Sequence, residues 1–171
     1  MSKKCVIITA PGFQDEEVVY PYYRLLEEGH FVEVATKDGA VVYGKYGVPA
    51  RATMATTDLK SANFDCVILP GGFEAPDRVR LLPEVQVFVR EMDEQKKLVA
   101  AICHGPWIMI SAKVCKGRKM TAFWSIEEDI RNSGADYQHK VSVVIDDNFI
   151  TSPHYNNNGD FMRAVISYLS C

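Results

Sequence analysis

The sequence has no apolar run long enough to cross a membrane and no large excess of charge of either sign. A spanning helix needs about 20 apolar residues, and no stretch of the chain approaches that length. The 171 residues carry a formal net charge of −3, so we expect no binding to nucleic acid or to an anionic membrane. The apolar run after Lys3-Lys4 is only as long as a strand, which argues against a signal peptide.

Cysteine pairs with metal-binding spacing are also missing. The cysteines are odd in number and scattered, with no CxxC motif, which argues against a disulfide framework and against a zinc cluster. His, Asp and Glu form no cluster with metal-ligand spacing either, so we predict no metal and no cofactor. These features favour a reducing, cytoplasmic compartment. The cysteines are Cys5, Cys66, Cys103, Cys115 and Cys171.

No repeat, linker or low-complexity segment interrupts the chain, so we predict one domain over residues 1–171. Short β-branched runs alternate with longer amphipathic ones, which predicts a mostly parallel sheet with helices on both faces. Residues 37–58 should form an extended excursion or a small hairpin. Strands are expected at 5–9, 31–35, 64–69, 98–102, 119–121, 141–145 and 148–151. Helices are expected at 16–28, 81–97 with a break before Pro83, 106–114, 126–133 and 159–169.

Residues 99–107 lead from a buried strand into Cys103, His104 and a Gly-Pro pair. Small residues two before and two after the cysteine, Ala101 and Gly105, are what the tight turn of a nucleophile elbow needs. N–H groups at the start of the following helix favour a thiolate. The alternative is an inert cysteine in a core strand. We interpret Cys103 as an ionised nucleophile held out into a cleft.

Ligands of such sheets bind where the strands end. The Gly71-Gly72 pair follows a central strand, and one of its N–H groups together with the N–H after the nucleophile would make an oxyanion hole. The alternative is an ordinary tight turn. The segments that should meet at this edge are 9–17, 70–78, 103–104, 121–125 and 152–155.

Three consecutive acids, Asp15-Glu16-Glu17, open the first helix, where the helix dipole favours negative charge. An acid that faces the cleft would hydrogen-bond the Cys103 sulfur in its protonated form, because burial beside a thiolate raises the pKa of a carboxyl group. Periodicity does not decide which of the three points inward. His104 and His154 are rival proton carriers, since each follows a predicted strand.

Four segments together resemble the PfpI family of intracellular cysteine proteases and amidases. They are FQDEEVVYP (13–21), LPGG (69–72), APDRVR (75–80) and AICHGP (101–106). The family lies in the superfamily of the parkinsonism-associated protein deglycase, which has the class I glutamine amidotransferase-like fold. The resemblance covers essentially the whole chain and implies a flavodoxin-like three-layer α/β/α sandwich.

The resemblance also implies roles for individual residues. Cys103 is the nucleophile, Glu17 is the acid against the thiol, and the backbones of Gly72 and His104 are the oxyanion donors. In the protease-like branch His104 is the base, and an acid from a neighbouring subunit completes the triad. The matching position is Asp77, one methylene shorter than the expected glutamate, which weakens the triad of the protease-like branch. The remaining candidates, for a substrate pocket, are Gly71, Phe13, Trp124 and His154.

Three functions stay open at this stage. The leading one is a cofactor-free enzyme in which Cys103 attacks a reactive carbonyl, as a glyoxalase or a protein deglycase acting on methylglyoxal or glycation adducts. The second is an intracellular cysteine peptidase or amidase. The third is a non-enzymatic redox-sensing or chaperone-like stress protein that uses oxidation of Cys103. A homodimer or larger homo-oligomer is expected from the resemblance.

Overall fold

The computed structural model describes residues 1–170, and Cys171 lies outside the described residues. A seven-stranded sheet runs in the order β10-β11-β7-β6-β1-β2-β5. All neighbouring strands are parallel except β10 and β11, which are antiparallel. The mostly parallel sheet is thereby confirmed. The strands are β1 (Lys4–Ile8), β2 (Phe31–Thr36), β5 (Met54–Ala55), β6 (Cys66–Leu69), β7 (Leu98–Ile102), β10 (Val144–Asp146) and β11 (Phe149–Ser152).

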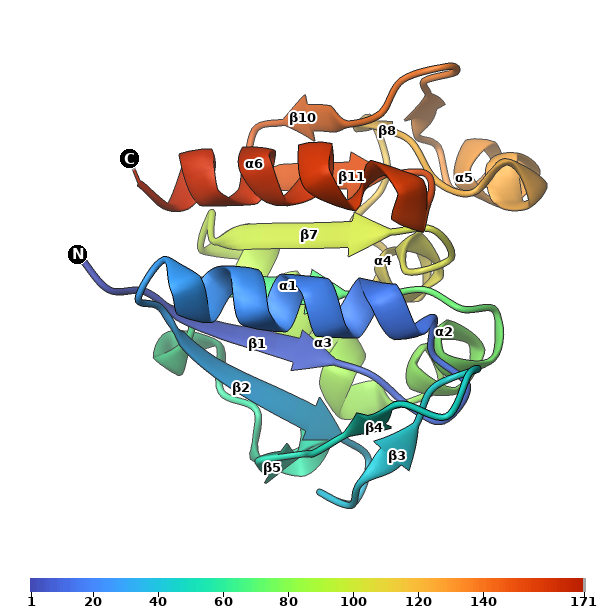
Figure 1. The fold of residues 1–171 in the computed structure, drawn as a ribbon. Coiled ribbons are helices and arrows are strands. Elements are labelled where there is room, and N and C mark those ends of the chain that lie inside the picture. Colours follow the sequence, from blue (N-terminus) through green and yellow to red (C-terminus); the bar gives the residue numbers. More distant parts are fainter. Residues whose placement is uncertain (171) are drawn as a thin grey trace.

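Helices cover both faces of this sheet. Helices α1 (Asp15–Glu27) and α6 (Asn158–Leu169) lie side by side in front of it, and α3 (Pro83–Glu94) lies behind it (Figure 1). On the rear side α4 (Pro106–Ser111) packs against α3, α2 (Glu74–Val79) and α5 (Glu127–Asn132). This is the predicted flavodoxin-like α/β/α sandwich. No helix of residues 1–170 is long and apolar enough to cross a membrane.

The central strands β6 and β7 are buried at every position. Because helices cover both faces of the sheet, neither face of these strands meets water, and their sequences read as continuous apolar runs. That pattern is why the prediction of a strand at 98–102 agrees with the observed bounds. The functional loops therefore start from a rigid edge.

The excursion at 37–58 contains the predicted small hairpin, formed by β3 (Val42–Tyr43) and β4 (Pro49–Ala50). Its loop is pinned to the start of α1, because the Asp15 carboxylate accepts hydrogen bonds from the N–H groups of Tyr46 at 2.9 Å and Val48 at 3.0 Å. The first of the three acids is therefore occupied in holding this hairpin.

Short elements were the least predictable part of the fold. The sequence indicated the strand β8 (Lys119–Met120) but neither α2 nor β9 (Asp136–Tyr137), with which β8 forms a two-stranded parallel sheet. Elements this short carry too few residues to display a period. The break expected before Pro83 is present, since α3 begins there. The 3-10 turns are η1 (Thr56–Asp58), η2 (Ser61–Asn63), η3 (Trp124–Ile126) and η4 (Tyr155–Asn157).

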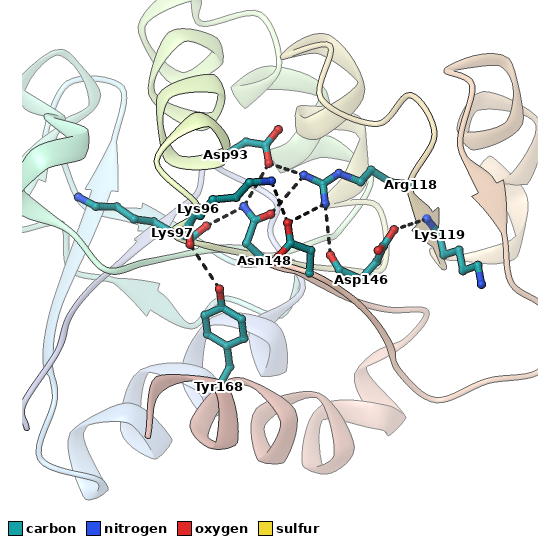
Figure 2. Close-up of polar contacts among 9 residues, drawn as sticks. Asp93, Lys96, Lys97, Arg118, Lys119, Asp146, Asn148 and Tyr168 are labelled. Atoms are coloured by element: carbon teal, nitrogen blue, oxygen red, sulfur yellow. Dashed lines mark hydrogen bonds and ion pairs between the residues drawn. The ribbon is translucent and has the colours of Figure 1, made fainter. Parts of the chain in front are cut away.

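A polar network at the amino-terminal end of β7 ties the β10–β11 hairpin to α3 (Figure 2). The Arg118 guanidinium lies 2.6 Å from the Asp93 carboxylate, and it packs over the Phe149 ring at 4.3 Å. The Asn148 amide donates to Asp93 at 3.1 Å and to the Lys97 carbonyl at 3.0 Å. These groups partner one another at the sheet end opposite Cys103, so their role is structural.

Candidate active site

Cys103 lies in a strained turn directly after β7. Its φ of +61° is in the left-handed region, which costs a non-glycine residue about 1–2 kcal/mol. The surrounding backbone enforces this conformation. The Cys103 N–H donates to the Ser152 carbonyl at 2.9 Å, and the Cys103 carbonyl accepts from the Phe123 N–H at 2.9 Å. A strained cysteine clamped by two neighbouring segments has the geometry of a nucleophile elbow.

Glycine is required at position 105 because the turn presses against β6. A Cβ atom there would overlap the Leu69 carbonyl oxygen. The Gly105 N–H also closes the turn by donating to the Ile102 carbonyl at 2.8 Å. The small residue that marked the elbow in the sequence therefore has a direct steric cause.

Glu17 is the acid that faces Cys103. Its side chain is fully buried, and its Oε2 accepts a hydrogen bond from the Gly71 N–H at 2.6 Å. Its Oε1 has no hydrogen-bond partner among residues 1–170. Burial raises the pKa of Glu17 to about 8, so the carboxyl group is mainly protonated at neutral pH. Glu16 is exposed, and the three acids thus have three different environments.

The environment of the Cys103 sulfur opposes ionisation, contrary to the predicted thiolate. Only 7% of the residue is exposed. Burial raises the pKa of the Cys103 thiol, and the Glu17 carboxyl raises it further once it is ionised, whereas the N–H groups of Gly72 and His104 lower it. The helix after the turn has only six residues, and its dipole does not offset the lost hydration. The thiol therefore keeps its proton until a base removes it.

His104 is placed to be that base. Its Nδ1 lies 3.2 Å from the Cys103 sulfur, which neighbouring residues achieve only because the elbow is not regular helix. Its ring stacks on Phe123 with centroids 4.9 Å apart, and its Nε2 lies 3.3 Å from the Ser125 hydroxyl. Burial lowers the pKa of His104, so the imidazole is neutral at pH 7 and free to accept a proton.

His154 lies near this site without a recorded contact to the sulfur among residues 1–170. Its Nδ1 accepts a hydrogen bond from the Asn156 N–H at 3.2 Å. Its ring stacks against those of Phe123 and Trp124, each with centroids 5.9 Å away. The geometry therefore favours His104 over its rival as the proton carrier.

The other sequence candidates lie in four different environments. Gly71 is at the centre, packed between Glu17 and Cys103. Phe13 is fully buried, while Trp124 is 64% exposed at the outer end of the aromatic stack. Asp77 is exposed on α2 and has no recorded ion pair or hydrogen bond within the described chain. Phe123 and Ser125 touch His104. Their segment, 121–125, was expected at this edge, but nothing in the sequence singled out these two residues within it.

Replacing Gly71 with alanine is expected to disable the site. The new Cβ would lie 2.6 Å from both Cys103 Cβ and Glu17 Oε2, and 2.9 Å from the His104 nitrogen. Overpacking of this kind costs about 1–3 kcal/mol, and here relief of the overlap must displace the reacting groups. We expect slower labelling of Cys103 by iodoacetamide and a lower unfolding midpoint. The control is Gly159→Ala, because the nearest atom to its new Cβ is the end of the flexible Arg163 side chain, 3.4 Å away. Equal labelling of both variants would contradict the prediction.

Comparison with known proteins gives a consistent result. The chain matches the DJ-1/PfpI family over residues 3–168. It is 39% identical to "Deglycase PfpI" of Pyrococcus furiosus over 166 residues, which are 97% of this chain and 99% of that protein. It is 38% identical to "General stress protein 18" of Bacillus subtilis, with 99% of each chain covered.

A solved structure from Anabaena variabilis has the same fold. That two-domain protein contains DJ-1/ThiJ/PfpI-like and ferritin-like domains, and it matches with a TM-score of 0.95 at 36% identity. The match covers 99% of this chain and 48% of the larger one. From the family match and these relatives together, the chain belongs to the DJ-1/PfpI family.

Proposed function

We propose that the protein is a cofactor-free, cysteine-dependent glyoxalase or protein deglycase, in which Cys103 attacks methylglyoxal or a glycation adduct derived from it. The observation that carries this proposal is the group around one sulfur atom. A neutral imidazole lies 3.2 Å away, a buried carboxyl group faces it, and the N–H groups of Gly72 and His104 point to it. The deglycase name of a relative at 39% identity supports the same reading.

The first step is addition to the aldehyde. His104 Nδ1 takes the thiol proton as the sulfur forms a bond to the aldehyde carbon. The N–H groups of Gly72 and His104 receive the negative charge that develops on the carbonyl oxygen. Return of a proton to that oxygen gives a hemithioacetal. The strained turn keeps the sulfur next to these two N–H groups during the addition.

The second step rearranges the hemithioacetal of methylglyoxal. A proton leaves the carbon bonded to sulfur and a proton is delivered to the neighbouring carbon, which converts the adduct into a thioester of lactate. Glu17 is suited to carry this proton, because an acid with a pKa near 8 exchanges protons readily at neutral pH. Water then cleaves the thioester, releases lactate and restores the thiol.

The test is an assay of D-lactate formation from methylglyoxal, and from N-acetylarginine pretreated with methylglyoxal, by the purified protein. A fluorogenic peptide is assayed in parallel, because the same nucleophile directed at an amide would make a peptidase. We expect lactate to accumulate and the peptide to stay intact. Peptide cleavage without lactate would contradict the proposal and favour the peptidase. Neither product, with rapid peroxide oxidation of Cys103, would favour the redox sensor.

A further inference from the structure

Both ring nitrogens of His104 are engaged by groups of the same chain. Nδ1 lies 3.2 Å from the Cys103 sulfur, and Nε2 lies 3.3 Å from the Ser125 hydroxyl. Stacking on Phe123 and edge contact with Trp107 hold the ring plane between them. The Ser125 hydroxyl is thus a hydrogen-bond partner for the second ring nitrogen of His104, and it comes from the same chain.

We propose that Ser125 is a positioning residue that fixes the tautomer of His104. When the Ser125 oxygen accepts a hydrogen bond from Nε2–H, the lone pair of Nδ1 is left facing the thiol, which is the form that acts as a base. As Cys103 reacts, its S–H bond breaks and an N–H bond forms at Nδ1. The positive charge of the resulting imidazolium is then shared with the Ser125 oxygen through Nε2–H.

The backbone of the segment that carries Ser125 is hydrogen-bonded to the elbow. The Phe123 N–H donates to the Cys103 carbonyl at 2.9 Å, and the Ile126 N–H donates to the Phe123 carbonyl at 3.0 Å. Ile126 is buried, which anchors the far end of η3. The backbone at position 125 therefore keeps its place relative to His104.

A neutral hydroxyl orients the imidazole but stabilises its charged form much less than a carboxylate would. This agrees with a His104 whose pKa is lowered by burial and with a thiol that is not ionised at rest. The charged and titratable groups that contact this imidazole or the rings packed on it are Cys103 with Glu17 beside it, His154 against Phe123, and Arg80 and Asp129 at Trp107. Arg80 and Asp129 contact the Trp107 ring instead of His104.

The test measures the rate of Cys103 alkylation by iodoacetamide as a function of pH, followed by mass spectrometry of the labelled peptide. Loss of one neutral hydrogen bond predicts a decrease of about five-fold near neutral pH for Ser125→Ala. Ser125→Thr should restore the rate, since it keeps the hydroxyl. Ser125→Asp should raise the rate below neutral pH and move the profile to lower pH, because a carboxylate stabilises the imidazolium.

The matched control is Ser2→Ala, which also removes one exposed hydroxyl that makes a hydrogen bond, here to the Gly29 carbonyl at 2.6 Å. Profiles of Ser125→Ala and wild type that coincide would overturn the proposal, and so would a lowered rate that threonine does not restore. A full loss in Asp77→Asn with none in Ser125→Ala would assign the role to Asp77. This role of Ser125 depends on the proposed function only in taking Cys103 as the nucleophile. Alkylation needs no substrate, so a failed lactate assay leaves this test intact.

Discussion

Replacing Cys103 with alanine is expected to abolish lactate formation from methylglyoxal while the protein stays folded. The proposed reaction passes through a covalent bond to this sulfur, so its removal leaves only the positioning of water and substrate. Losses of a nucleophile are typically 10³-fold or larger, and we expect a decrease of at least about 10³-fold in kcat/KM. The measurement is D-lactate release per enzyme, with circular dichroism and thermal unfolding recorded on the same sample.

Cys115→Ala is the matched control for this variant. Cys115 is also a buried free thiol, only 1% exposed, and it lies outside the site. Both variants lose one sulfur atom from a packed environment, so both should lose a similar, small amount of stability. Only the Cys103 variant should lose activity. Lactate output that is unchanged by Cys103→Ala would remove the basis of the enzymatic proposal.

The elbow could be predicted from the sequence because its signals are local. A strand buried on both faces has to be apolar at every position, and the position in a sharp turn where a Cβ atom would overlap β6 has to be glycine. Both requirements appear in consecutive residues from Leu98 to Gly105. The site at the ends of the parallel strands followed from the topology of the fold.

The properties of the groups at the site could not be predicted, because they depend on contacts distant in the sequence. Three adjacent acids all suit a helix start, and only the approach of Gly71, 54 residues away, identifies Glu17 as the one that faces Cys103. The helix start predicted an ionised Cys103, whereas burial, a tertiary effect, raises the pKa of its thiol. The contact of Ser125 with His104 spans 21 residues and leaves no pattern.

Replacing Glu17 with glutamine is expected to change both the activity and the pH dependence of stability. In the folded protein the pKa of Glu17 is raised from 4.5 to about 8, chiefly by burial. Between these pH values the unfolded chain releases a proton that the folded chain retains, so the stability of the wild type falls as pH rises. The stability from the neutral carboxyl is fully present below pH 4.5 and is lost above pH 8.

The total change across this window is on the order of 5 kcal/mol. Glu17→Gln keeps the acceptor for the Gly71 N–H but has no proton to lose, so its free energy of unfolding should stay nearly flat where that of the wild type declines. Urea denaturation at several pH values measures the difference, with Glu16→Gln, a change in the exposed neighbour, as the control. Parallel pH profiles for wild type and Glu17→Gln would contradict the neutral, buried carboxyl.

The same substitution should slow lactate formation by about 10²-fold, the usual effect of losing a general acid or base. Glutamine is close in size to glutamic acid but does not transfer protons, so the loss reports on chemistry and not on packing. Because the variant is expected to be the more stable protein above pH 8, a lower rate at that pH would not arise from unfolding. Stability and activity would then move in opposite directions, as expected where a buried acid is kept for its reactivity at a cost in folding free energy.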